Sequence, residues 1–151
     1  MTRLLLLGIL AMVIGCNQSG GNANSNSGSP NMPKDTISHG RVTLLKFETE
    51  MGNPDADAVK AGMDAATSTL NDLLADEELK PAAGTFIGRF RLETDGRVRM
   101  FLTDKATSIS NIVDGKLTDA FVGAAFGGKC SFPELGDIAM VYAEFRIDPP
   151  N

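Results

Sequence analysis

The fold is decided by residues 85–103, which read TFIGRFRLETDGRVRMFLT. Apolar and polar residues alternate in both halves of this stretch, and Asp-Gly lies between the halves, so we expect two antiparallel strands joined by a tight turn. A two-residue turn would place Leu92 opposite Arg99 and bury a charge, whereas the three-residue loop Thr-Asp-Gly pairs Leu92 with Val98. The sequence therefore predicts the three-residue loop, with Gly96 in the left-handed conformation that glycine adopts without strain.

This register assigns the side chains of the hairpin to the two faces of a sheet. The apolar face is expected to carry Phe86, Gly88, Phe90, Leu92, Val98, Met100 and Leu102. The other face is expected to carry Arg89, Arg91, Arg97, Arg99 and Phe101. Arg91 is expected to lie opposite Arg99, and Phe90 opposite Met100, so positive charge should gather on the face that does not contact the core.

Strand and helix patterns flank the hairpin on both sides. Apolar residues recur at steps of three and four in two stretches, as in amphipathic helices, and alternation marks a first and a last strand. We expect a strand at residues 42–50, a helix from Pro54 to about Lys80 with Asn53 as its N-cap, a second helix within residues 109–124, and a last strand at residues 138–147. The order strand, helix, strand, strand, helix, strand predicts an α+β fold, an antiparallel-rich sheet with two helices on one face.

The first 15 residues are typical of a signal peptide. Arg3 gives a positive start, and the apolar run at residues 4–14 is shorter than the roughly 18–20 residues that span a bilayer as a helix. The sequence Val-Ile-Gly-Cys ends this run and resembles the bacterial lipobox. That resemblance implies cleavage before Cys16 and acylation of Cys16 on its sulfur and then on its amine, which anchors the protein to a membrane.

Residues 16–40 are expected to comprise the lipidated cysteine and a flexible tether. The segment is rich in Asn, Ser and Gly and has too few apolar side chains to offset the entropy cost of ordering. His39, at the end of the tether, is expected to be a solvated linker residue. Residues 41–151 are expected to form a single α+β domain.

The composition excludes several classes of protein. A net charge of -5 without basic blocks is atypical of proteins that bind nucleic acid. One His and two Cys leave no zinc-site pattern, and with the single His in the tether we expect no catalytic residues, metal or cofactor. Cys130 is expected to be a buried or half-buried free thiol if Cys16 is acylated.

Residues 84–147 resemble the C-terminal domain of TonB-type proteins, particularly the AgmX/PglI-like variants. The resemblance is carried by Asp-Gly-Arg-Val at residues 95–98, by residues 108–111 before a helix, by Phe132 and Pro133, and by Gly136 before a closing strand. The chain departs from the TonB plan because it has no transmembrane segment or Pro-rich spacer, and because Cys130 does not lie early in the second helix. The resemblance implies a non-catalytic envelope module that binds other proteins.

We therefore expect an envelope lipoprotein, attached to the periplasmic side of the outer membrane or to the inner membrane, that binds a protein partner. The candidate partner-binding residues are Arg89, Arg91, Arg97, Arg99 and Tyr142. An alternative is a solvated face neutralised by Glu93, Glu144 and Glu48 or Glu50. Another alternative is binding of envelope polysaccharide or a small ligand on the open sheet face, where Phe101 and Tyr142 would stack on it.

Replacing Cys16 with serine tests the predicted anchor. Because a serine hydroxyl does not replace the cysteine thiol as the acceptor of the lipid, Cys16→Ser should move the protein from the membrane fraction to the soluble fraction, as fractionation and immunoblotting would measure. An unchanged membrane fraction would contradict lipidation at Cys16.

Overall fold

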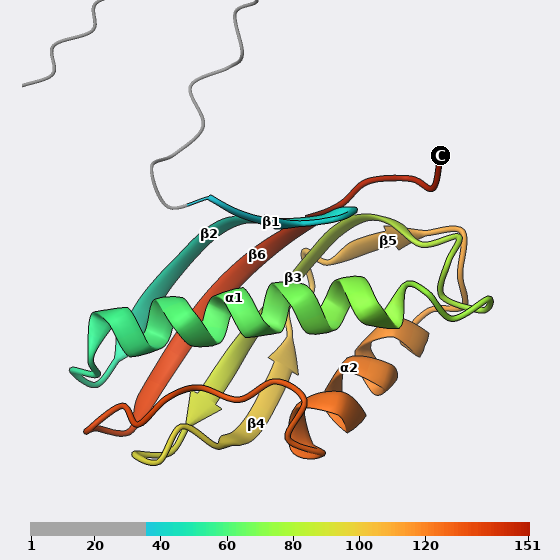
Figure 1. Ribbon diagram of the computed structural model, residues 1–151. Coiled ribbons are helices and arrows are strands. Elements are labelled where there is room, and N and C mark those ends of the chain that lie inside the picture. Colours follow the sequence, from blue (N-terminus) through green and yellow to red (C-terminus); the bar gives the residue numbers. More distant parts are fainter. Residues whose placement is uncertain (1–35) are drawn as a thin grey trace, which may run out of the picture. The chain divides into compact units, whose positions relative to one another are not determined.

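A computed structural model describes residues 36–151 of the chain (Figure 1). The predicted signal peptide, Cys16 and the predicted tether up to residue 35 lie outside the described residues. Within residues 36–151, no helix is both long enough and apolar enough to cross a membrane.

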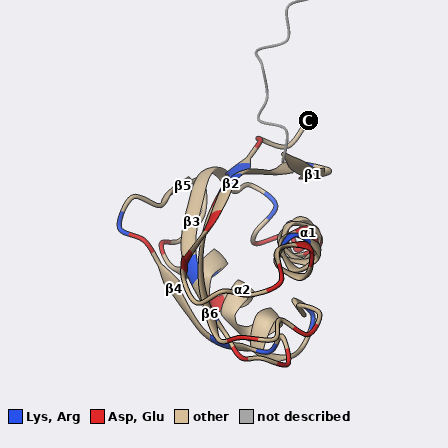
Figure 2. Cartoon of the chain, turned by 90° about the vertical axis from the view of Figure 1, so that its left-hand side faces the viewer, with Lys and Arg blue, Asp and Glu red and all other residues tan. Residues whose placement is uncertain are grey.

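The described residues form an α+β fold of six strands and two helices, as the sequence predicts. The elements are β1 (Ile37–His39), β2 (Val42–Met51), α1 (Ala56–Leu73), β3 (Ala83–Leu92), β4 (Val98–Thr103), β5 (Ser108–Ser110), α2 (Lys116–Phe126) and β6 (Ala139–Ile147). The short strands β1 and β5 are additions to the predicted order. Both helices lie on one side of the sheet (Figure 2), and no helix of residues 36–151 covers the other side, which we call the open face.

The last strand lies in the middle of the sheet. The strand order is β1-β2-β6-β3-β4, with β5 pairing β3, and every pair is antiparallel. Ile147 of β6 pairs with Val42 of β2 and with Gly84 of β3. Since β2 and β3 both run antiparallel to β6, they are parallel to each other, and α1 makes the crossover between them.

Aromatic side chains fill the core between the sheet and the helices. Phe86, Phe90, Phe121 and Phe145 are fully buried. The ring centroids of Phe90 and Phe121 lie 5.8 Å apart, and the ring planes make an angle of 87°. Aromatic pairs prefer this edge-to-face arrangement. Ala139, Val141, Ala143, Phe145 and Ile147 alternate inward along β6 as predicted.

The hairpin between β3 and β4 has the predicted loop but a different register beyond it. Leu92 pairs with Val98, and Gly96, at φ +80°, donates its N–H to the carbonyl of Glu93 at 2.9 Å, which confirms the loop. A β-bulge follows, at which Arg99 is the additional residue. The expected Phe90–Met100 pair was therefore wrong, because Phe90 pairs with Phe101.

From Met100 onward, the bulge moves each side chain of β4 to the face opposite to the expected one. Phe101 enters the core, 4.8 Å from the Phe90 ring and 5.0 Å from the Phe121 ring, while Met100 and Leu102 turn to the open face. A Cβ atom at Gly88 would lie 2.2 Å from the Phe101 ring, so only glycine leaves room for this ring. Burial of an aromatic ring outweighs regular alternation here, since a ring buries more apolar surface than a methionine or leucine side chain.

Helix α1 is shorter at both ends than predicted. Asp55, and not Asn53, is the N-cap, and its carboxylate accepts the N–H of Ala58 at 2.8 Å. The helix ends at Leu73 and not near Lys80. Asp76 accepts the Glu78 N–H through its side chain at 2.8 Å, a local turn that competes with a continued helix.

Helix α2 also begins later than predicted. Residues 108–110 form β5 along β3, and α2 starts at Lys116 after Gly115, which has φ +81°. The apolar spacing at Ile109 and Ile112 fits a helix, but Ile109 lies in β5 and Ile112 in the bend that follows it, and both side chains are partly buried against the core. The helix ends at Phe126, two residues beyond the expected range, and Gly127 is its C-cap.

His39 belongs to the folded domain and not to the tether, so its prediction as a linker residue was wrong. Strand β1 pairs Ile37 with Leu44 and His39 with Val42. The His39 Nε2 lies 2.7 Å from Oδ1 of Asp64, on α1. The folded domain thus begins a few residues before the predicted boundary at residue 41.

Alanine substitutions at two glycines separate conformational strain from crowding. Gly96 and Gly136 both have positive φ, but a Cβ at Gly96 would lie 2.0 Å from the carbonyl oxygen of Phe132, whereas Gly136 has open space. Gly136→Ala should cost roughly 1–2 kcal/mol of unfolding free energy, the cost of the left-handed conformation. Gly96→Ala should cost about 1 kcal/mol or more beyond that, because the crowded backbone must shift. Equal costs in chemical denaturation would contradict the contact between the hairpin loop and Phe132.

Candidate functional site

Residues from four strands form straight rows across the open face. One row, which we call the central row, runs Glu48, Tyr142, Arg89, Leu102 through β2, β6, β3 and β4. A second, which we call the methionine row, runs Met51, Met140, Arg91, Met100 through the same strands. Directly paired residues of antiparallel strands point to the same side, so each row presents its side chains together.

Arg89 is fixed at the centre of the open face by two carboxylates. Its Nε lies 2.9 Å from Oε2 of Glu50 and its Nη1 lies 2.6 Å from Oδ2 of Asp104. The hydrogen bonds with Asp104 and Glu50 raise the pKa of Arg89 above its usual value. The pKa of Asp104 is lowered, first by the N–H of Ala106 and then by Arg89.

Tyr142 lies between two cations. The Arg89 guanidinium is 5.3 Å and the Lys46 ammonium 5.4 Å from the centroid of its ring, distances at which cation–π attraction operates. Partial desolvation and the nearby Glu144 carboxylate raise the pKa of Tyr142. Lys46 in turn pairs with Glu48 at 3.0 Å, and this hydrogen bond raises the pKa of Lys46.

The centre of the open face is therefore close to neutral and not strongly basic. Lys46 and Arg89 are balanced by the carboxylates that pair with them, Glu48, Glu50 and Asp104. The alternative of a face neutralised by carboxylates therefore holds for this part of the sheet, where Glu50 pairs with Arg89 and Glu48 with Lys46. Arg89 and Tyr142 remain candidates for binding, but as members of a fixed network.

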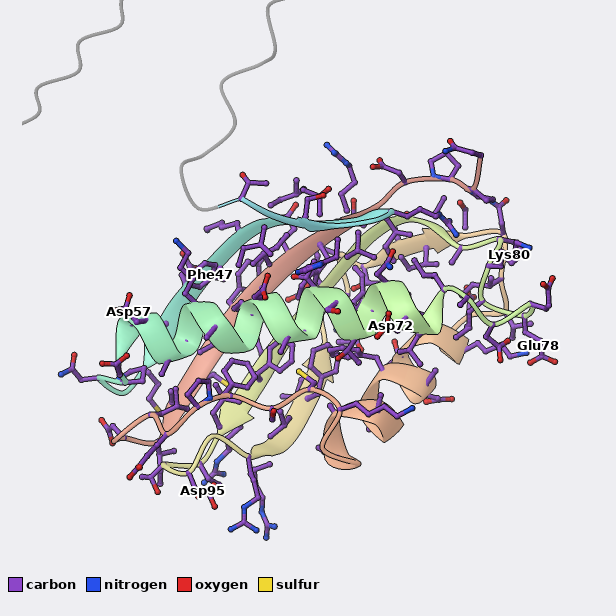
Figure 3. All side chains as sticks on the ribbon, in the orientation of Figure 1. Phe47, Asp57, Asp72, Glu78, Lys80 and Asp95 are labelled. Carbon is purple, nitrogen blue, oxygen red and sulfur yellow. The ribbon has the colours of Figure 1, made fainter. Side chains whose placement is uncertain are left out.

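The structure divides the five candidate binding residues into two groups. Arg89, Arg91 and Tyr142 lie in neighbouring rows of the open face. Arg97 and Arg99 lie at the end of the hairpin, where they line a hollow together with Phe126, which is 55% exposed. Arg97 forms an ion pair with Asp95, at the hairpin tip labelled in Figure 3. The expected pairing of Arg91 with Arg99 was wrong in detail, because the bulge places Met100 opposite Arg91 and leaves Arg99 as the additional residue beside them.

Sequence reasoning missed the methionine row. Met51 falls beyond the predicted end of its strand, and Met100 was assigned to the core. Met140 is out of phase with the inward residues of β6, which is the signal that places it on the open face. Met51 and Leu102 are 51% and 50% exposed.

The described part of the chain offers few side chains for metal binding or thiol chemistry. No group of three or more His, Cys, Asp or Glu among residues 36–151 is arranged to hold a metal ion. Cys130 is 1% exposed and free, as predicted for a buried thiol, and burial raises its pKa to about 12. A thiol with that pKa carries almost no thiolate at neutral pH, so Cys130 is a poor nucleophile.

Comparison with known proteins gives no match: no family model, no curated protein and no solved structure matches the chain. The resemblance to the TonB C-terminal domain stays a prediction.

The Asp104 carboxylate should make the stability of the domain depend on pH in the acidic range. Because the pKa of Asp104 is lowered in the folded state, its charge stabilises the fold above the usual carboxyl pKa near 3.9. This contribution is lost as the pH falls through and below that value. Asp104→Asn should therefore lower the Tm at pH 7 but leave a smaller difference from the unmodified protein at pH 3.

The matched control is Asp72→Asn, which removes an exposed carboxylate from the surface of α1 (Figure 3). It should change the Tm at pH 7 by less than Asp104→Asn does, because Asp72 forms no ion pair within the described residues. If Asp104→Asn behaves like Asp72→Asn, then the Arg89–Asp104 contact does not stabilise the fold.

Proposed function

We propose that this chain is a non-catalytic envelope lipoprotein, anchored through Cys16, that binds a partner protein on the open face of its sheet. The observation that carries the proposal is the pair of rows just described. Arg89, Tyr142 and the methionines belong to the residue types that are enriched in protein interfaces. Exposed apolar groups at Met51 and Leu102 lie among them, so the face offers both apolar contact and directed polar contact.

The fixed position of the central side chains supports protein binding. Arg89 contacts Glu50, Asp104 and the ring of Tyr142 at the same time. Side chains that are already ordered lose less conformational entropy when a partner docks on them. A pre-ordered surface of four strands therefore suits a folded partner or an extended segment of one.

The alternative, binding of a polysaccharide, has less support. Sugar rings commonly stack on aromatic side chains, and Phe101, one of the two expected on this face, lies in the core. In the two rows only Tyr142 is aromatic, and its ring already contacts Lys46 and Arg89. We therefore rank a protein partner above a glycan.

The lipid anchor gives the proposal its cellular setting. The anchor and the signal peptide rest on the sequence alone, and we propose that they hold the domain at the periplasmic side of the outer membrane or at the inner membrane. Such a domain meets other envelope proteins at short range, so modest affinity is sufficient for association.

Site-specific photo-crosslinking in intact cells tests the proposal. A photoreactive phenylalanine analogue at Leu102, which is half exposed in the central row, should give an adduct of one discrete mass that mass spectrometry identifies as a protein. The same analogue at Asp72, on α1, should not give that adduct. Adducts only with glycans or lipids, or the same adduct from both positions, would contradict protein binding on the open face.

A further inference from the structure

The methionine row combines flexible apolar side chains with a cation. Met51, Met140 and Met100 lie in one line across the sheet, and Arg91 stands between Met140 and Met100. Methionine is unbranched and polarisable, and it is common on surfaces that adapt to a partner. This row therefore differs from the central row, in which ion pairs hold the two charged side chains, Glu48 and Arg89.

Arg91 and Arg99 differ from the other arginines of the sheet because they have no carboxylate partner within the described chain. Arg89 pairs with Glu50 and Asp104, Arg97 with Asp95, and Arg146 with Asp148. The Nε of Arg91 is buried and makes no hydrogen bond in the described structure. The bulge in β4 places Arg99 next to Met100, the residue that pairs with Arg91, while the Arg99 side chain lines the hollow at the end of the hairpin.

Resting on the function proposed above, we infer that the methionine row receives an acidic side chain of the partner, flanked by apolar side chains. A carboxylate would supply the missing counter-charge for Arg91 through charge-assisted hydrogen bonds. Leucine- or valine-like neighbours of that carboxylate would cover Met51, Met140 and Met100. The row thus recognises an acidic segment with apolar side chains on either side.

The surrounding charges favour such a segment over a polyanion. The neighbouring strands carry Glu48 and Glu50 on the same side of the molecule, and the net charge of the chain is -5. A lipid surface or a nucleic acid would bring many negative charges against these carboxylates, whereas one acidic side chain needs only the unpaired guanidinium of Arg91. The site accordingly matches a carboxylate with apolar neighbours.

Methyl NMR on methionine gives a direct test. The probe is the acetylated peptide Gly-Leu-Glu-Val-Glu-Leu-Gly amide, added to the mature lipidated protein, labelled at its methionine methyl groups, in phosphatidylcholine nanodiscs. The signals of Met51, Met100 and Met140 should shift with a common dissociation constant, while Met63, which is fully buried, should stay in place. The same peptide with both glutamates replaced by glutamine should bind at least about tenfold more weakly.

Matched variants separate the site from general charge. Arg91→Gln should weaken peptide binding about tenfold or more. Arg146→Gln removes an equal charge from the other end of β6 and should leave binding unchanged. If Arg91→Gln disturbs the fold, as a moved Met63 signal would show, Arg99→Gln gives a second test at an exposed position and should also weaken binding.

Three outcomes would overturn the inference: equal binding of the glutamate and glutamine peptides, equal effects of Arg91→Gln and Arg146→Gln, or shifts that arise from phosphatidylglycerol nanodiscs without peptide. The last outcome would assign the row to lipid phosphate. If the Leu102 crosslink forms in cells while the peptide moves no signal, the proposed function stands and only the acidic specificity fails. If neither result is obtained, both fail.

Discussion

The structure depends on the insertion of the C-terminal strand β6 between β2 and β3. Both neighbours pair with β6 along nearly its whole length, so β2 and β3 belong to one sheet only once β6 lies between them. Arg41 holds one end of this arrangement, since its guanidinium donates to the carbonyls of Asp148 at 2.8 Å, Lys80 at 2.8 Å and Ala82 at 2.5 Å. Contacts between such distant parts of the chain carry a large loop-closure cost, which burial along β6 must offset.

The same strand determines the open face. Tyr142 lies beside Arg89 and Glu48, and Met140 beside Arg91 and Met51, only because β6 has one register with each neighbour. A slip of one residue would turn Val141 and Phe145 outward and bury Tyr142 and Glu144, so the buried side chains of β6 fix the register strongly. The packing of the core and the composition of the candidate site are thus set by one constraint.

The sequence predicts those features that depend on local pattern. The faces of β6, the three-residue hairpin loop and the α+β order follow from alternation and turn chemistry over a few residues. The bulge at Arg99 does not follow, because it depends on room for the Phe101 ring over Gly88, a contact between different strands. The sequence does not predict β1 and β5 either, since a strand of three residues shows little periodicity. These residues form strands because they pair with β2 and β3.

The candidate site shows the same division between local and distant information. Alternation is sufficient to place Arg89, Arg91 and Tyr142 on one face, but the carboxylates that neutralise Arg89 come from the end of β2 and the start of the β4–β5 loop. Arg89 and Arg91 are equivalent in pattern, two residues apart on one strand. Their neighbours make them different: Arg89 lies within reach of Glu50 and Asp104, whereas Arg91 lies between methionines. Arg91 has no carboxylate partner among the described residues, so its guanidinium, unlike that of Arg89, has no ion pair to give up when an acidic side chain approaches.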